Sequence, residues 1–163
     1  MIQKLIIFSF FLLPSIAIGA DLRGRVGIGF TNQLANDIPA ISLKTQQSKT
    51  FALGAMLGFK SNNDNTLYGA GIKLYRIIFD EPQLNFYMAA LLASETYLNQ
   101  KKEVQTGHQI DGTIGSEFHF SGLESLGFSL EFGLSVRKVN SEGGNSFQTL
   151  GDQFLKAAVH FYL

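Results

Sequence analysis

Apolar and polar residues alternate at period two along most of the chain, which is the pattern of a β-strand with one apolar face. In the segment 155–163, Leu155, Val159 and Phe161 lie on one face, and Lys156 and His160 lie on the other. The same alternation predicts eight strands, over the ranges 22–31, 39–46, 51–59, 68–74, 86–95, 110–120, 126–137 and 149–163. The range 39–46 is the weakest of these, and 86–95 is apolar on both faces, so a helix is an alternative there.

The segments between these strands are rich in residues that favour turns. With both ends of the chain on the same side, three short turns fall on that side and four longer loops on the other. The expected turns are 46–48, 78–83 and 121–125, and the expected loops are 32–38, 61–65, 98–107 and 140–148. Such a succession of hairpins is typical of an up-and-down antiparallel sheet.

The second face of each strand distinguishes a membrane barrel from a soluble sandwich. A solvent-exposed sheet face usually carries side chains that cover the pleat. Here that face holds mostly Gly, Ala and Ser with isolated charges, which fits the narrow interior of an eight-stranded barrel. We therefore predict an all-β, transmembrane, antiparallel up-and-down β-barrel in which 22–31 pairs with 149–163, because an open edge is costly in hydrocarbon. A soluble periplasmic β-sandwich is the alternative.

The amino terminus has the composition of a secretory signal peptide. Lys4 precedes an apolar run over 5–13, which Pro14 and small residues follow up to Ala20. We predict a signal peptide over 1–20 and a single barrel domain over 21–163. Without Lys4 the 13 basic residues fall to 12, against 13 acidic residues, so the mature net charge is −1 and predicts no nucleic-acid partner. Cysteine is absent, so no disulfides are expected.

Several charged residues lie on the face assigned to the lumen and are predicted to form a structural network that plugs it. Isolated buried charges are very costly, so these groups must pair or be hydrated. We expect Arg25 and Lys156 to be partners of Glu117 and Glu131. The predicted network consists of Arg23, Arg25, Asp111, Glu117, Glu131, Arg137 and Lys156, and Lys44, Lys60, Lys73, Glu95, Asp152, His119 and His160 lie on the same face.

One motif permits an enzymatic alternative. His119 and Ser121 are two residues apart on one strand, with Glu131 on the next. This resembles the His-x-Ser arrangement of outer-membrane lipid A deacylases, which implies a serine nucleophile activated by histidine. Gly122 stands where that family has asparagine. We assign no catalytic residue. With no cysteine and three histidines that lack ligand spacing, we also predict no metal site and no cofactor.

The whole 21–163 segment resembles the small eight-stranded outer-membrane barrels of the OmpX and OmpA-barrel type. The resemblance rests on the strand pattern and on the aromatic-rich terminal strand. It implies that Phe161 and Leu163 belong to a signal read by the barrel-assembly machinery, that the protein is located in the bacterial outer membrane, and that it contacts lipid and lipopolysaccharide. We expect a monomer with a structural or interaction role. A narrow ion or small-solute channel is the alternative.

Overall fold

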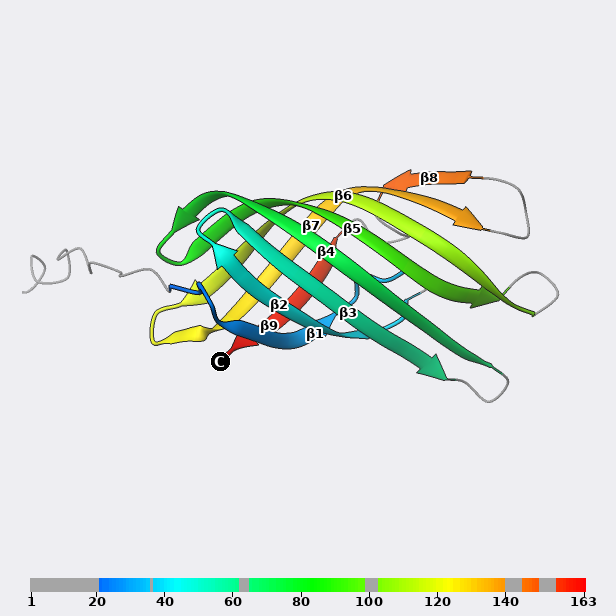
Figure 1. Ribbon diagram of the computed structural model, residues 1–163, viewed down its shortest axis with the longest axis horizontal. Coiled ribbons are helices and arrows are strands. Elements are labelled where there is room, and N and C mark those ends of the chain that lie inside the picture. Colours follow the sequence, from blue (N-terminus) through cyan, green and yellow to red (C-terminus); the bar gives the residue numbers. More distant parts are fainter. Residues whose placement is uncertain (1–20, 36, 62–64, 99–102, 140–144, 150–154) are drawn as a thin grey trace, which may run out of the picture.

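The chain forms a closed antiparallel barrel, seen in a computed structural model that describes residues 21–35, 37–61, 65–98, 103–139, 145–149 and 155–163 (Figure 1). The strands are β1 (Val26–Thr31), β2 (Ala40–Ser48), β3 (Phe51–Ser61), β4 (Thr66–Glu81), β5 (Leu84–Leu98), β6 (Val104–Phe120), β7 (Leu123–Val139), β8 (Asn145–Thr149) and β9 (Lys156–Tyr162). Eight of them close the barrel, as predicted, and among the described residues the short β8 pairs with the end of β7 alone.

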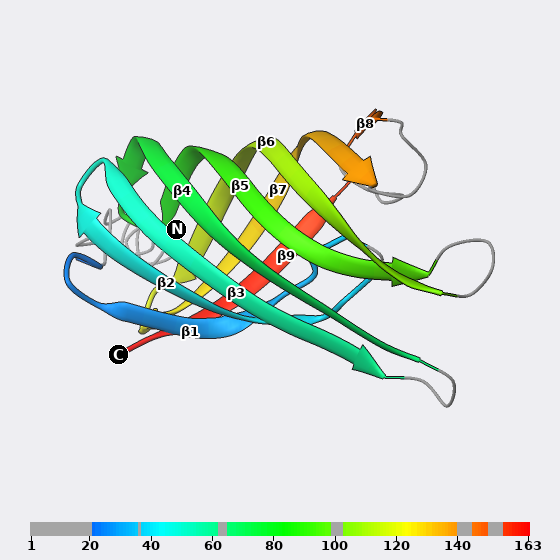
Figure 2. The same ribbon diagram turned by 45° about the vertical axis from the view of Figure 1, so that its right-hand side comes forward.

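The first and last strands seal the barrel, as expected from the cost of an open edge in hydrocarbon. Gly27 pairs with Tyr162 and Thr31 with Ala158, and β9 also pairs with β7 (Figure 2). Asn32 extends this seam, because its side-chain oxygen accepts a 2.8 Å hydrogen bond from the backbone N–H of Ala157. The turns at 49–50, 82–83 and 121–122 lie at the same end as the C-terminus, hereafter the turn end. The opposite end is the loop end (Figure 1), and it includes the described residues 32–35 and 37–39, hereafter the segment 32–39.

Several strand boundaries differ from the predicted ones. β4 continues to Glu81 and β6 starts at Val104, so residues assigned to the turn 78–83 and the loop 98–107 are paired in the sheet. β2 continues to Ser48, which moves the first turn to 49–50. These extensions carry polar residues beyond the regular alternation, where backbone pairing with the neighbouring strand decides the structure. The segment 86–95 is a strand within β5 rather than a helix.

The first strand is shorter than predicted, because the chain turns before it. Gly24 has a φ of +74°, a conformation that glycine adopts without steric cost, and β1 begins only at Val26. Leu22 is buried at this turn, whereas Arg23 is exposed. The prediction that 22–31 is one continuous strand is therefore wrong over its first four residues.

The two faces of the wall have opposite character. Large apolar side chains such as Phe30, Leu57 and Ile72 point outward and are 71%, 69% and 62% exposed, respectively. Polar and charged residues, including Lys73 and Glu131 at 1% exposure each, fill the interior. A water-soluble protein distributes these residues in the reverse way. The described residues contain no helix that is long and apolar enough to cross a membrane.

Candidate functional site in the barrel lumen

Glu117 on β6 is the centre of a polar cluster in the half of the lumen nearer the turn end. Lys44 on β2, across the barrel, donates a 2.7 Å hydrogen bond to one carboxylate oxygen. Tyr162 donates to the other oxygen at 2.6 Å, and Ser129 donates to that oxygen at 3.4 Å. The Lys44 ammonium also lies 4.6 Å from the centre of the Tyr75 ring. A buried carboxylate thus has one cation and two hydroxyl donors.

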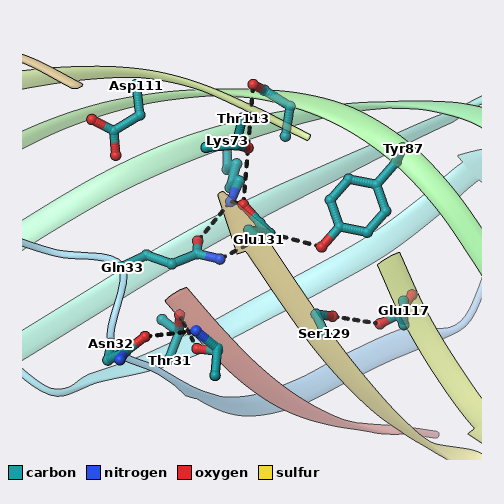
Figure 3. Close-up of polar contacts among 12 residues, drawn as sticks. Thr31, Asn32, Gln33, Lys73, Tyr87, Asp111, Thr113, Glu117, Ser129 and Glu131 are labelled. Carbon is teal, nitrogen blue, oxygen red and sulfur yellow. Dashed lines mark hydrogen bonds and ion pairs between the residues drawn. The ribbon is translucent and has the colours of Figure 1, made fainter. Parts of the chain in front are cut away.

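Glu131 on β7 is the centre of a second cluster, closer to the loop end (Figure 3). It forms a buried ion pair with Lys73 on β4. Tyr87 and Thr113 donate hydrogen bonds to its two carboxylate oxygens at 2.8 and 2.9 Å. Gln33 completes the cluster.

Gln33 joins both partners of this ion pair. Its amide nitrogen donates to Glu131 at 2.9 Å, and its amide oxygen accepts from Lys73 at 2.8 Å (Figure 3). Gln33 belongs to the segment between β1 and β2, so this connection is folded into the barrel. The prediction that 32–38 is an external loop is therefore wrong. Gln33, Leu34, Ala35 and Ile38 are buried, with at most 3% exposure.

Apolar packing holds the same segment in place. Leu34 and Ile38 form a cluster with residues of the wall, namely Ala40, Met56, Leu91 and Ala93. Two wall glycines make room for them. A Cβ atom added at Gly58 would lie 2.9 Å from Ile38, and one at Gly69 would lie 2.9 Å from Leu34. Apolar residues within an otherwise polar loop were the sequence signal that could have indicated burial.

Residues at the loop end tie the inserted segment to β6. The backbone N–H of Ala35 donates to the side-chain oxygen of Gln109 at 3.0 Å. The Gln109 amide nitrogen in turn donates to Asp111 at 2.6 Å. Nearby, Arg137 lies 3.7 Å from Glu95. Polar contacts therefore connect the segment 32–39 to the wall from the level of Glu131 up to the loop end.

The structure places most, but not all, of the predicted charge network in the lumen. Asp111, Glu117, Glu131 and Lys156 are buried in the lumen, and Arg137 is half-buried there. Arg23 is outside it, exposed and paired with Asp21 at 2.5 Å, because the turn at Gly24 diverts the chain before β1. Arg25, half-buried, precedes β1. Asp152 and the signal peptide 1–20 lie outside the described residues.

The prediction that Arg25 is an ion-pair partner of Glu117 or Glu131 is wrong. The ion pairs of Glu117 and Glu131 are made by Lys44 and Lys73. Lys156 does lie directly opposite Glu131 in the pairing of β7 with β9. A long lysine side chain reaches across a narrow lumen, so the two strands that meet at closure need not supply the partner.

The deacylase-like motif is not assembled into a catalytic group. His119 is buried in the lumen, and its Nε2 lies 3.8 Å from Glu117. Ser121 is exposed in the turn after β6 and accepts a hydrogen bond from Gln83. Glu131, the third member of the motif, is engaged by Lys73. Two residues apart in sequence, His119 and Ser121 are separated by the end of the strand.

Comparison with known proteins supports the fold. The N-terminal β-barrel domain of Pseudomonas aeruginosa OprF has a similar structure, with a TM-score of 0.58 and 16% sequence identity, over 86% of this chain and 98% of that domain. No protein-family model matches the chain, and no curated protein matches it. The chain is therefore an eight-stranded barrel similar to the OprF barrel, with buried, paired charges inside.

Proposed function

We propose that this protein is an integral barrel of the bacterial outer membrane with a structural or interaction role and a closed lumen. The observation that carries this proposal is the inverted distribution of residues. Apolar side chains such as Phe30, Leu57 and Ile72 cover the outer wall, while charged residues such as Lys73 and Glu131 are buried inside. In hydrocarbon a closed antiparallel barrel leaves no strand edge with unpaired backbone N–H and C=O groups. Such barrels present an apolar outer band to lipid.

The turn end faces the periplasm in this proposal, and the loop end faces outward. The outer-membrane lipids, including lipopolysaccharide, are then the surroundings of the wall, and the barrel is a monomer. Phe161 and Leu163 are exposed on the outer face at the end of the terminal segment 155–163, by 54% and 69%, and in this proposal they are the residues that the barrel-assembly machinery reads. Replacing Phe161 with serine is expected to lower the assembled fraction, whereas Leu155→Ser at the other end of this segment is the matched control.

The inserted segment 32–39 supports a plugged lumen rather than a conducting one. An ion would have to displace Gln33 from Lys73 and Glu131 and then pass the Lys44–Glu117 pair. Each step leaves a buried charge with fewer partners, which costs free energy. A narrow channel is the second candidate, because charged and polar side chains line the middle of the lumen, and it requires the segment to leave the lumen.

Three measurements on the purified protein test the proposal. A folded barrel should migrate differently on a gel before and after boiling in detergent, and the unboiled protein should require detergent or lipid to stay in solution. Planar bilayers containing the folded protein should show no regular conductance steps. A protein that is soluble without detergent contradicts the membrane barrel, whereas steps in wild-type protein contradict only the closed lumen and favour the channel.

A further inference from the structure

One row of outward residues crosses five strands of the wall, β3 to β7, near the loop end. Leu57 pairs with Ala70, Ala70 with Ser94, Ser94 with His108, and His108 with Lys138. All five point away from the lumen and are exposed. The small side chains of Ala70 and Ser94 lie in the middle of the row, and the two nitrogen-bearing side chains lie together at one end.

The small residues create a groove in the outer wall. A hollow of about 520 Å³ is lined by Ala55, Leu57, Ala70, Ile72, Leu92 and Ser94, with His108 at its edge. A second hollow of about 430 Å³ shares Leu57, Ala70 and Ser94 and continues towards the loop end past Tyr68 and Thr106. Together they form a single groove, which is apolar towards the turn end and more polar towards the loop end.

His108 and Lys138 mark the border of the apolar band on their strands. The next outward residues towards the turn end are Ile110, 57% exposed, and Val136, 37% exposed. Towards the loop end β6 continues with the exposed Thr106. A charged side chain on the lipid face costs little at this border, whereas it costs several kcal/mol at the bilayer midplane. This is the level at which lipid headgroups meet hydrocarbon.

We propose that this groove is a binding site for a phosphate-bearing acyl lipid of the outer leaflet. An acyl chain lies over Ala70 and Ser94 between Leu57 and Ile72, where small side chains leave the space. The phosphate lies at the edge of the groove, where Lys138 supplies a positive charge and His108 a ring N–H, since charge-assisted hydrogen bonds are among the stronger polar contacts. The inference rests on the proposed membrane location and adds to it a specific lipid site.

Charge favours lipid over a second copy of the chain as the occupant. A symmetric dimer through this patch would bring two copies of the same surface together. It would thereby place two Lys138 ammonium groups in one interface, where like charges repel each other. A lipid phosphate has the opposite charge and is attracted to the same edge.

Native mass spectrometry of the folded protein in detergent tests the site. The probes are bis-phosphorylated lipid A and the same lipid with both phosphates removed. We expect discrete adducts with the phosphorylated probe that are weakened about tenfold in His108→Gln/Lys138→Gln, the size of effect that about 1.4 kcal/mol of lost binding free energy produces. The double variant should bind the dephosphorylated probe as the wild type does. Ala70→Phe/Ser94→Phe, which fills the groove, should weaken both probes.

Ala157→Phe is the control, because Ala157 is also small and exposed on the outer wall but lies on β9, away from the groove. It should leave lipid binding unchanged. Gel mobility before and after boiling verifies that each variant is folded. Equal binding of both probes by the wild type, unchanged binding in the filled-groove variant, or dimers in place of lipid adducts would overturn the proposal. These outcomes leave the membrane barrel intact, whereas solubility without detergent would remove both.

Discussion

Lys73 on β4 and Glu131 on β7 form an ion pair across the lumen, 58 positions apart in the sequence, and both side chains are 1% exposed. Gln33, Tyr87 and Thr113 complete the hydrogen bonding of the carboxylate. A buried ion pair is costly to break from one side only, because the remaining charge stays in the low-dielectric interior.

Removing one partner of the pair should destabilise the barrel more than removing both. We expect Lys73→Met to lower the free energy of unfolding by about 3–5 kcal/mol. Lys73→Met/Glu131→Gln should recover part of that loss, since no unpaired charge remains. Urea unfolding in detergent micelles or lipid vesicles measures both. Glu81→Gln, an exposed carboxylate at the end of β4, is the control and should change little. A double variant less stable than Lys73→Met would contradict the pairing.

The segment 32–39 should leave the lumen when its apolar anchor becomes charged. Leu34 is fully buried against wall residues, and an unpaired carboxylate at that position costs several kcal/mol. We expect Leu34→Asp to make this segment cleavable by an added protease while the barrel stays folded. Asp37→Asn is the control, because Asp37 is exposed with a φ of 52°, a conformation that asparagine tolerates.

Conductance provides the second measurement on the same variant. If the inserted segment closes the lumen, Leu34→Asp should show conductance steps in planar bilayers that the wild type lacks. An uncleaved, non-conducting Leu34→Asp protein would mean that the segment remains in place despite the charge.

The closing seam should not tolerate a side chain at Gly29. A Cβ atom there would lie 1.7 Å from the backbone oxygen of Val159 on β9, so the two strands would have to separate. Overpacking typically costs about 1–3 kcal/mol, and a clash with backbone costs at least that much. Gly29→Ala should reduce the fraction of protein with the gel mobility of a folded barrel. Gly112→Ala is the matched control, since a Cβ atom at Gly112 meets no atom within 4 Å. Equal folding of the two variants would contradict the seam geometry.

The exposed pair of Asp21 and Arg23 gives a pH-dependent prediction. Hydrogen bonds and charge from Arg23 lower the pKa of the Asp21 carboxyl from its ordinary value of 3.8 to about 2. Because the folded-state pKa is depressed, the pair contributes its stabilisation above pH 3.8 and loses it as the pH falls through 2. An NMR titration should find the Asp21 midpoint near 2, and Arg23→Gln should return it towards 3.8. A wild-type midpoint near 3.8 would show that the pair does not form.

The alternation of apolar and small or polar residues was sufficient to predict the closed eight-stranded barrel. Period two fixes which face each side chain occupies once a segment is a strand, and hydrocarbon excludes open strand edges. The prediction that Glu117 and Glu131 point into the lumen follows from this periodicity alone. So does the pairing of the first strand with the last, which the contacts between Gly27 and Tyr162 confirm.

The tertiary structure decided which charges meet and what fills the loop end of the lumen. Periodicity assigns a face, but it carries no information on which side chains reach across the barrel, so the pairs Lys44–Glu117 and Lys73–Glu131 emerge only after closure. The turn at Gly24 placed Arg23 outside for a local backbone reason. The inserted segment depends on Gly58 and Gly69, which are distant in sequence and provide space for Leu34 only when the wall brings them beside it. Local sequence patterns therefore determined the strands of the barrel wall, and contacts between distant residues determined which side chains fill the lumen.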